Sequence, residues 1–533
     1  MGREQAFVVL TMHGHRETLK VRSEDFKKYL KWLYYATYKK VVPGYVIQEV
    51  VELLEAKAIH EGSEEPVFKR VASQDNCIYL DIGDKGRSVI CITPEEWHTV
   101  QNATVNFIRK DSQEALPFPL RGGSILDLKP FINLRNDDNF LIFVSYLIRA
   151  LCPWGPYPIL NLRGGPGTAK STILQIAKKL VDPSFMPVRK LPENDRDIFI
   201  SASNAWMLAY DNVSKCSEAA SDTLCMLSTG GGFGTRVLFT NDEELFIKTL
   251  QPVAIAGITN LIAKGDLAER CLTLVLPKIV KHRPEKDLWV KFRAVYPAIL
   301  GSLCDVLVCA LRNISSVKSD ELPRMADYME WILAAKEALP PSPRGFLDIY
   351  RENQNALVEV ALETDPMAQA VLSLMENLTT WKGTAAEALR DLGKQPAVSD
   401  KTRLPSWPKA PNKLREHLQN VEPYLLNHGI TIEFDIREDQ GARKLRFEKA
   451  GQRPVAGSQA VSPEVFMQEA EPKACEAEGQ VEDEGYQSVF DTETLRSIQD
   501  KLCNSPPAEK EPEIEEEGLY QSVFDSDDHD KPL

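Results

Sequence analysis

The chain contains a glycine-rich loop between segments that predict an apolar strand and a helix, and this pattern leaves few possible folds for the central region. Residues 164–171 read Gly-Gly-Pro-Gly-Thr-Ala-Lys-Ser and fit G-x-x-x-x-G-K-[ST] at every fixed position except 169, where alanine replaces the usual glycine. YPILNL before the loop predicts a strand, and STILQIAKKL after it predicts a helix. In this context backbone N–H groups and the positive end of the helix surround a phosphate, whereas the alternative is a plain glycine-rich turn.

The motif assigns a role to its polar residues and implies ATP and Mg²⁺ as ligands. Lys170 is expected to reach the β- and γ-phosphates, and the Ser171 hydroxyl is expected to ligate Mg²⁺. A methyl group at Ala169 fits the loop if that residue has a negative φ. The expected nucleotide contacts are Gly164, Gly165, Pro166, Gly167, Thr168, Ala169, Lys170, Ser171 and Thr172.

A second component of the site is expected at the end of a later strand. In AWMLAYDN, residues 206–210 predict a buried strand, and Asp211 follows it as the acid that would hold Mg²⁺ through water. The next residue is Asn212, whose amide can orient a water molecule but cannot take its proton. The general base for hydrolysis is therefore either elsewhere or absent.

Two further residues complete the predicted catalytic set of Lys170, Asp211, Asn260 and Arg270. QPVAIAGITN predicts another buried strand, and Asn260 at its end could contact the γ-phosphate and the attacking water. GDLAERCLTLVLP places Arg270 just before a strand, where it could act on the ATP of a neighbouring subunit. A surface ion pair is the alternative role for Arg270.

Periodicity divides the chain into five regions. Residues 1–137 predict helices over 22–60 followed by short strands, with Gly83-Asp84-Lys85-Gly86 as a hairpin turn. Strands and helices alternate over 138–320, which predicts an α/β sheet sandwiched by helices, and a helical extension follows over 321–363. Residues 364–450 predict helices and then a hairpin, either a winged helix or another small α+β domain.

The last region, 451–533, is acidic and is predicted to be disordered. It holds 21 of the 77 acidic residues but only 6 of the 63 basic ones, so the net charge of −14 belongs to the tail and the remaining chain is close to neutral. EDEGYQSVFD at 482–491 recurs as EEEGLYQSVFD at 515–525. The repeat predicts two docking sites for one protein partner, or else a duplication without consequence.

The positions of the cysteines and the composition of the N-terminus indicate which metal sites and which cellular location to expect. The ten cysteines form no C-x-x-C pair, which argues against a zinc site or a disulfide framework. The N-terminus has no cleavage pattern and no membrane-spanning run was identified, so a cytoplasmic location without membrane contact is expected.

The order of these motifs resembles the AAA+ helicase ATPases of superfamily 3, especially phage- and plasmid-type primase-helicases. The resemblance rests on GGPGTAKST, LAYDN, LSTGGGFGTRVLFTNDEELFIKT, ITN and LAERCLTLVLP, and covers about residues 138–280. The P-loop is also similar to that of minichromosome maintenance helicases, where alanine commonly precedes the lysine. The resemblance implies a homo-hexameric AAA+ ring that acts on DNA, single-stranded or forked. Many AAA+ enzymes carry a catalytic glutamate where this chain has Asn212.

The same resemblance implies a hairpin that grips DNA in the central channel of the ring. TRVLFT and ELFIKT would flank its turn, with Arg236 and Lys248 as the basic residues, although the turn itself, residues 241–244, is acidic. The predicted winged helix would add further DNA contacts through Lys413, Arg415, Arg443, Lys444 and Arg446. Solvated charges without a DNA role are the alternative for these residues.

Two functions follow as hypotheses. The first is a mobile-element or phage-type replication ATPase that couples ATP hydrolysis to DNA unwinding or remodelling. The rival is a nucleotide switch that assembles on ATP and recruits a partner through its tail, and a metabolic kinase is a distant third. Turnover stimulated by DNA separates the first two.

Overall fold

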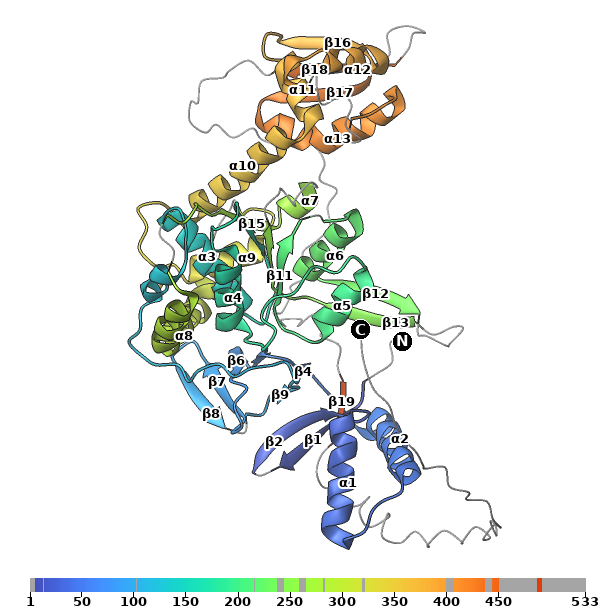
Figure 1. Ribbon diagram of the computed structural model, residues 1–533, viewed down its shortest axis with the longest axis vertical. Coiled ribbons are helices and arrows are strands. Elements are labelled where there is room, and N and C mark those ends of the chain that lie inside the picture. The colour runs from blue at the N-terminus through green and yellow to red at the C-terminus, as the bar shows by residue number, and fades with distance from the viewer. Residues whose placement is uncertain are drawn as a thin grey trace, which may run out of the picture. The chain divides into compact units, whose positions relative to one another are not determined.

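The structure is a computed structural model, shown in Figure 1. It describes residues 5–12, 14–101, 103–214, 216–236, 244–257, 265–280, 283–318, 322–398, 407–436, 443–449 and 487–490.

The N-terminal segment begins with a hairpin and continues with two helices. Strands β1 (Phe7–Met12) and β2 (His15–Lys20) pair antiparallel around Gly14, whose φ of 84° suits the turn. Helix α1 (Glu24–Tyr38) begins where the Ser23 side chain accepts a hydrogen bond from the Phe26 amide. Helix α2 (Gly44–Glu61) and strand β3 (Ser63–Glu65) follow. The two predicted helices are confirmed.

The short strands expected after residue 67 are also present. β5 (Val71–Gln74), β6 (Cys77–Asp81), β7 (Ser88–Ile92) and β8 (Trp97–Gln101) form an antiparallel sheet in chain order. β4 (Val67–Phe68) pairs in parallel with β9 (Asn106–Phe107), and a 3₁₀ helix, η1 (Ile125–Phe131), follows. The predicted hairpin turn at 83–86 joins β6 to β7.

A parallel four-stranded sheet forms the centre of the chain (Figure 1). Its strands lie in the order β11 (Leu208–Val213), β14 (Val253–Gly257), β10 (Ile159–Arg163) and β15 (Cys271–Val275). Helix α3 (Asp137–Ala150) precedes the sheet, and the connecting helices are α4 (Lys170–Val181), α5 (Asp195–Ser203), α6 (Glu218–Thr229) and α7 (Gly265–Ala268). The α/β pattern predicted for this region is confirmed.

Alternate residues of the central strands belong to two different hydrophobic cores. Leu160 and Leu272 belong to one core with α3 and α4, whereas Ile159 and Tyr210 belong to another with α5 and α6. Because successive strand residues point to opposite faces, both faces of the sheet are covered by helices. The first core also includes apolar residues of the antiparallel sheet, among them Val71, Leu80 and Ile92, so that sheet shares packing with the central domain.

Long helices complete the first core. α8 (Glu285–Asn313), η2 (Ile314–Ser316), α9 (Ala326–Ala334) and α10 (Phe346–Thr364) follow the central sheet. By length and composition the stretch Glu285–Ser316 could cross a membrane, but 61% of its apolar window is buried inside the fold, as in a core helix.

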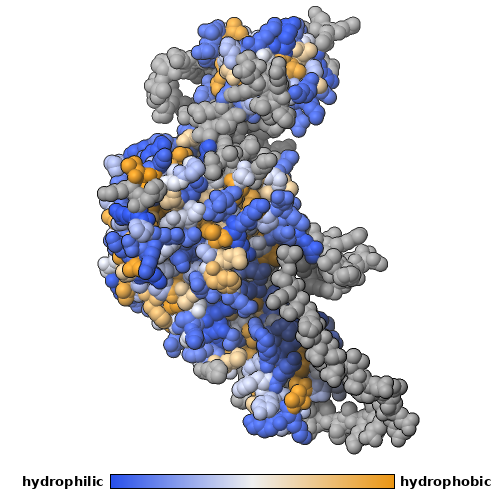
Figure 2. All heavy atoms as spheres, viewed as in Figure 1, coloured by the Kyte–Doolittle hydropathy of each residue, from blue (hydrophilic) through white to orange (hydrophobic). Residues whose placement is uncertain are grey.

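On the face drawn in Figure 2, hydrophobic side chains lie scattered among hydrophilic ones.

A small domain follows, in which helices precede a hairpin as predicted. Its elements are α11 (Pro366–Leu374), β16 (Thr380–Thr384), α12 (Ala385–Gly393), η3 (Pro396–Val398), α13 (Pro411–Asn427), β17 (Ile430–Ile436) and β18 (Lys444–Lys449). β16 was not anticipated and gives a three-stranded sheet in the order β16-β18-β17. Phe447 and Leu414 are fully buried in a core of its own.

The structure differs from the sequence expectation at one place in the tail. Residues Gln487–Phe490 form strand β19, which lies between β1 and β3 in one sheet. Disorder was predicted over the whole of 451–533, and this prediction is wrong for those four residues. The remaining tail lies outside the described residues.

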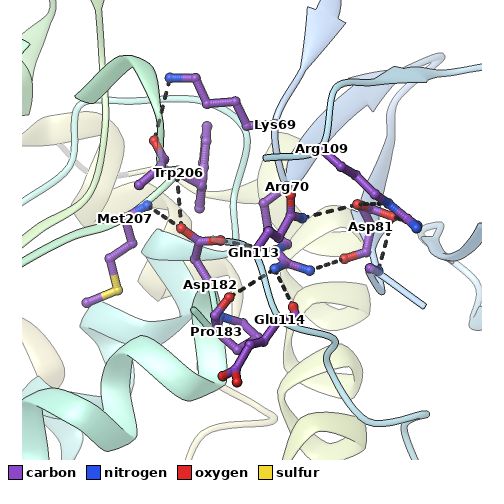
Figure 3. Close-up of polar contacts among 12 residues, drawn as sticks. Lys69, Arg70, Asp81, Arg109, Gln113, Glu114, Asp182, Pro183, Trp206 and Met207 are labelled. Carbon is purple, nitrogen blue, oxygen red and sulfur yellow. Dashed lines mark hydrogen bonds and ion pairs between the residues drawn. The ribbon is translucent and has the colours of Figure 1, made fainter. Parts of the chain in front are cut away.

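Buried charges join α4 to the antiparallel sheet (Figure 3). The Arg70 guanidinium donates to an Asp182 carboxylate oxygen at 3.1 Å and to backbone carbonyls including that of Asp81. Lys178 donates to the other Asp182 oxygen at 2.6 Å, and that oxygen also accepts from the Trp206 amide at 2.9 Å. The carboxylate is thus satisfied on both oxygens and holds the C-terminal end of α4.

Candidate nucleotide-binding site

The glycine-rich loop joins the carboxyl end of β10 to the N-terminus of α4, as the motif requires. Lys170 is the first residue of α4, and its Nζ donates to the carbonyls of Gly164 at 2.6 Å and Gly165 at 2.8 Å. The Thr168 hydroxyl donates to the Gly165 carbonyl at 3.0 Å. The loop thus curls around its own lysine, and the N-terminal amides of α4 carry the partial positive charge that favours an anion.

Close contacts explain the glycine at 164, and backbone conformation explains the glycine at 167. The same criterion makes alanine at 169 unusual. A Cβ at Gly164 would lie 2.7 Å from Thr168 Oγ1, so no side chain fits there. Gly167 has a φ of 74°. Ala169 has a φ of 64°, in the left-handed region, so the condition for its methyl group to fit without strain, a negative φ, is not met. The residue before Lys170 needs the conformation that glycine adopts most readily, and its methyl group makes the loop strained.

We expect Ala169→Gly to raise the free energy of unfolding by about 1 kcal/mol. The change removes the left-handed penalty of an L-residue, which exceeds the added chain entropy of glycine. Urea unfolding checks the value. Gly165→Ala is the matched control, because a Cβ there meets nothing within 4 Å, and it should change stability by less. A destabilised Ala169→Gly variant would contradict strain at this residue.

The loop is anchored by residues that the motif does not include. The Asn133 side-chain amide donates to the carbonyls of Thr168 at 3.1 Å and Pro277 at 2.6 Å. The Ile279 amide donates to the Gly167 carbonyl at 3.2 Å. Asn133 was missed in the sequence because it lies in an irregular segment before α3 and carries no local motif. It ties the loop to the segment that follows β15.

An open pocket of about 620 Å³ lies beside the loop. Gly167, Ala169 and Thr172 form its loop side. Apolar side chains give it a surface for a flat ring, and charged groups at its margin can meet polar substituents. These other lining residues include Phe131, Ile132, Ile279, Arg283, Asp287, Leu288 and Lys291.

Asp211 lies at the same edge of the sheet as the loop, because parallel strands end together. It is half-buried in β11, which extends through Val213 rather than ending at Tyr210. Burial lowers the pKa of Lys170, and the negative charge of Asp211 acts in the opposite direction. Lys170 and Asp211 thus lie at the same edge of the sheet, with Ser171 in the first turn of α4.

Backbone conformation accounts for the asparagine at position 212. Its φ is 52°, and the pairing of β11 with β14 shifts register between Tyr210 and Val213. Its backbone N–H donates to Asp211 Oδ1 at 2.7 Å. Asparagine tolerates the left-handed region better than glutamate, so this turn suits Asn212 and supplies no carboxylate base.

Arg270 lies at the opposite edge of the sheet from Lys170. Its carbonyl accepts from the amide of Ile159, the first residue of β10, whereas Lys170 follows the last residue of that strand. Its guanidinium forms an ion pair with Asp266, which also pairs with Arg324 at 2.6 Å. Arg270 therefore cannot join the phosphate site of its own chain. Asn260, the fourth predicted catalytic residue, lies outside the described residues.

The predicted hairpin is present, but its first strand starts earlier than expected. β12 (Gly231–Arg236) pairs antiparallel with β13 (Glu244–Thr249). Arg236 lies opposite Glu244, and Lys248 lies opposite Gly232. The acidic turn lies largely outside the described residues.

Carboxylates accompany most of the predicted DNA-binding residues of the C-terminal domain. Asp435 pairs with Arg415 at 2.6 Å and lies 3.6 Å from Arg443, and Glu433 pairs with Arg446 at 3.2 Å. Lys413 is exposed on α13, and Lys444 is half-buried in β18. These pairs reduce the net positive charge that the sequence suggested for the hairpin and last helix.

Metal clusters and disulfides are absent from the part of the chain that the structure describes. That part includes no group of three or more His, Cys, Asp or Glu side chains that could hold a metal ion. Its eight cysteines are free thiols.

Two adjacent stretches of the chain match one protein family. Residues 125–357 match the actinomycete integrative conjugative element replication protein, and residues 367–462 match the RepA C-terminal domain of these elements. None of the curated proteins matches the chain. Two apo structures of the NrS-1 C-terminal region are each 12% identical to it, with TM-scores of 0.33 and 0.35. These matches cover 69% and 75% of this chain and 96% and 98% of the others, and at such scores they carry no inference.

Proposed function

The chain is a replication protein of a mobile element, and from this premise we propose that its central domain binds ATP with Mg²⁺ and hydrolyses it to unwind or remodel DNA. The observation that carries the proposal is the convergence of the Lys170 loop and Asp211 at one edge of a parallel sheet. Lys170 and the α4 amides would hold phosphate, and Ser171 and Asp211 would hold the metal, which would screen the phosphate charge. The pocket beside the loop would take the base and ribose.

The strand order supports an AAA+-type assignment within that proposal. β14 lies between β10 and β11, so a residue following β14 would lie between the loop and Asp211. Asn260 follows that strand in sequence and keeps its proposed role at the γ-phosphate. Arg270 lies at the other edge of the sheet from the loop of its own chain, which favours contact with the ATP of a neighbouring subunit in a ring. We propose that this ring is a hexamer and acts in the cytoplasm. Release of Arg270 from Asp266 is then required.

A nucleotide switch is the second candidate, and Asn212 is the observation that favours it. The residue after Asp211 is an asparagine, whose amide cannot take a proton from water. This position therefore supplies no general base. A switch would bind ATP, change its oligomeric state and turn over slowly.

Turnover of ATP by the full chain, with and without single-stranded DNA, separates the two candidates. Stimulation by DNA of several-fold, followed by strand separation on a forked duplex, is the expected result. Tight binding of ATP with negligible turnover on every DNA tested would replace the ATPase by the switch. Failure to bind ATP at all would refute both.

A further inference from the structure

The strand contributed by the tail, β19, completes a sheet that would otherwise have a gap. β19 pairs in parallel with β1, with Val489 opposite Phe7 and Phe490 opposite Val8. On its other side it pairs antiparallel with β3, with Gln487 opposite Glu65 and Val489 opposite Ser63. Without β19, the facing edges of β1 and β3 would both present unpaired backbone groups. We name this place, between residues 7–8 and 63–65, the β1–β3 slot.

The walls of the slot are suited to hold an extended peptide. Phe7 and Val8 of β1 are buried. Helix α2, which lies against β19, contributes the buried side chains of Val51, Leu54 and Ala58. Pairing with two strands gives an added strand main-chain hydrogen bonds on both sides, and this is the recurring mode of peptide recognition by strand addition.

The chain holds a second copy of the peptide that fills the slot. Residues 486–491 and 520–525 have the same sequence, Tyr-Gln-Ser-Val-Phe-Asp, and acidic residues precede both. We propose that the β1–β3 slot is a binding site for this sequence and that Gln521–Phe524 is a second ligand for it, in exchange with Gln487–Phe490. Equal sequence gives the second copy the same register and the same alternation of side chains.

Tether length predicts how the two copies share the slot. From Lys449, the end of the preceding domain, residues 450–486 lead to the first copy and residues 450–520 lead to the second. The second tether is about twice as long, so its effective concentration is lower by about threefold. The first copy should therefore hold the slot for roughly three quarters of the time.

Proline substitutions test the exchange in the full chain. Val489 is in register with both neighbours, so Val489→Pro removes an amide and cannot fit an interior strand. Val523→Pro makes the same change in the second copy. The readout is hydrogen exchange, followed by mass spectrometry, of amides in residues 5–12 and 62–66.

The expected protection of these amides from exchange depends on which copies of the peptide can still occupy the slot. Val489→Pro alone should speed exchange about fourfold, because the second copy takes over. Val523→Pro alone should have almost no effect, and the double variant should speed exchange by at least a further tenfold. A synthetic Gly-Tyr-Gln-Ser-Val-Phe-Asp-Thr peptide should restore protection to the double variant, and a scrambled peptide should not.

Two outcomes overturn the proposal. Loss of protection in Val489→Pro as large as in the double variant means that the second copy does not enter the slot. Full protection in the double variant means that the tail does not occupy it. Unchanged exchange in β10 and α4 establishes that the variants are folded, and failure of the peptide to restore protection counts against the slot as a binding site.

Discussion

Replacing Lys170 with alanine should lower ATP turnover by at least about 100-fold, since loss of one positioned donor to a developing phosphate charge typically costs a factor of 10² to 10³. Lys170 is only 8% exposed and already lies within the loop, 2.6 Å from the Gly164 carbonyl. Its ammonium group therefore needs little reorganisation to meet a phosphate. Turnover is measured under saturating ATP with single-stranded DNA present, and nucleotide binding is measured separately.

The control for this variant lies on the same helix. Lys179 is in the last turn of α4, away from the loop, and its ammonium group lies 5.6 Å from the centre of the Trp289 ring. Lys179→Ala should keep turnover within about twofold, since Lys179 is half-buried at the far end of α4 and its cation–π contact does not involve the loop. Normal turnover in Lys170→Ala would place the phosphates elsewhere and would refute the proposed site. Urea unfolding of both variants separates a lost contact from a lost fold.

Local signals made the centre of the site predictable. A strand, a loop with fixed residues and a helix occur together in one short segment, so the position of Lys170 followed directly from the sequence. Asp211 followed from an apolar strand with an acid at its end, because parallel strands place such residues at one edge. What the sequence could not give was the left-handed φ of Ala169 and Asn212, since the neighbours that impose it come from other segments.

Long-range partners account for the features that were missed. Asn133 anchors the loop through Pro277, and β19 pairs with β1, which is more than 470 residues away in the chain. No local pattern identifies such a partner. The β1–β2 hairpin had a usable signal, because Gly14 separates two short extended stretches, but it was not among the predicted elements.

Charges that become buried are another class that the sequence analysis did not identify. No local pattern marks Arg70, Lys178 and Asp182 as buried, yet all three are nearly inaccessible to solvent. Their burial is tolerable only because each charge meets an opposite charge or several carbonyls.

Asp182→Ala should lower the free energy of unfolding by about 3–5 kcal/mol, because it leaves Arg70 and Lys178 buried without their counter-charge. It also removes the acceptor of the Trp206 and Met207 amides. Such a loss is a large part of the stability of an ordinary domain. Urea unfolding measures it against Asp25→Ala, which breaks the exposed pair with Lys28 and should cost less than about 1 kcal/mol.

The pH dependence separates the charge of Asp182 from its packing. Burial by itself would raise the pKa of Asp182, but the charges of Lys178 and Arg70, with hydrogen bonds from Lys178 and Met207, outweigh it and lower the pKa below its ordinary value of 3.8. A carboxyl group with a lowered pKa in the folded state stabilises fully above its unfolded value and loses that contribution as the pH falls further. The wild type should therefore lose stability more steeply below about pH 4 than Asp182→Asn, which keeps the shape without the charge. Equal slopes for the two proteins would mean that the carboxylate contributes through shape alone.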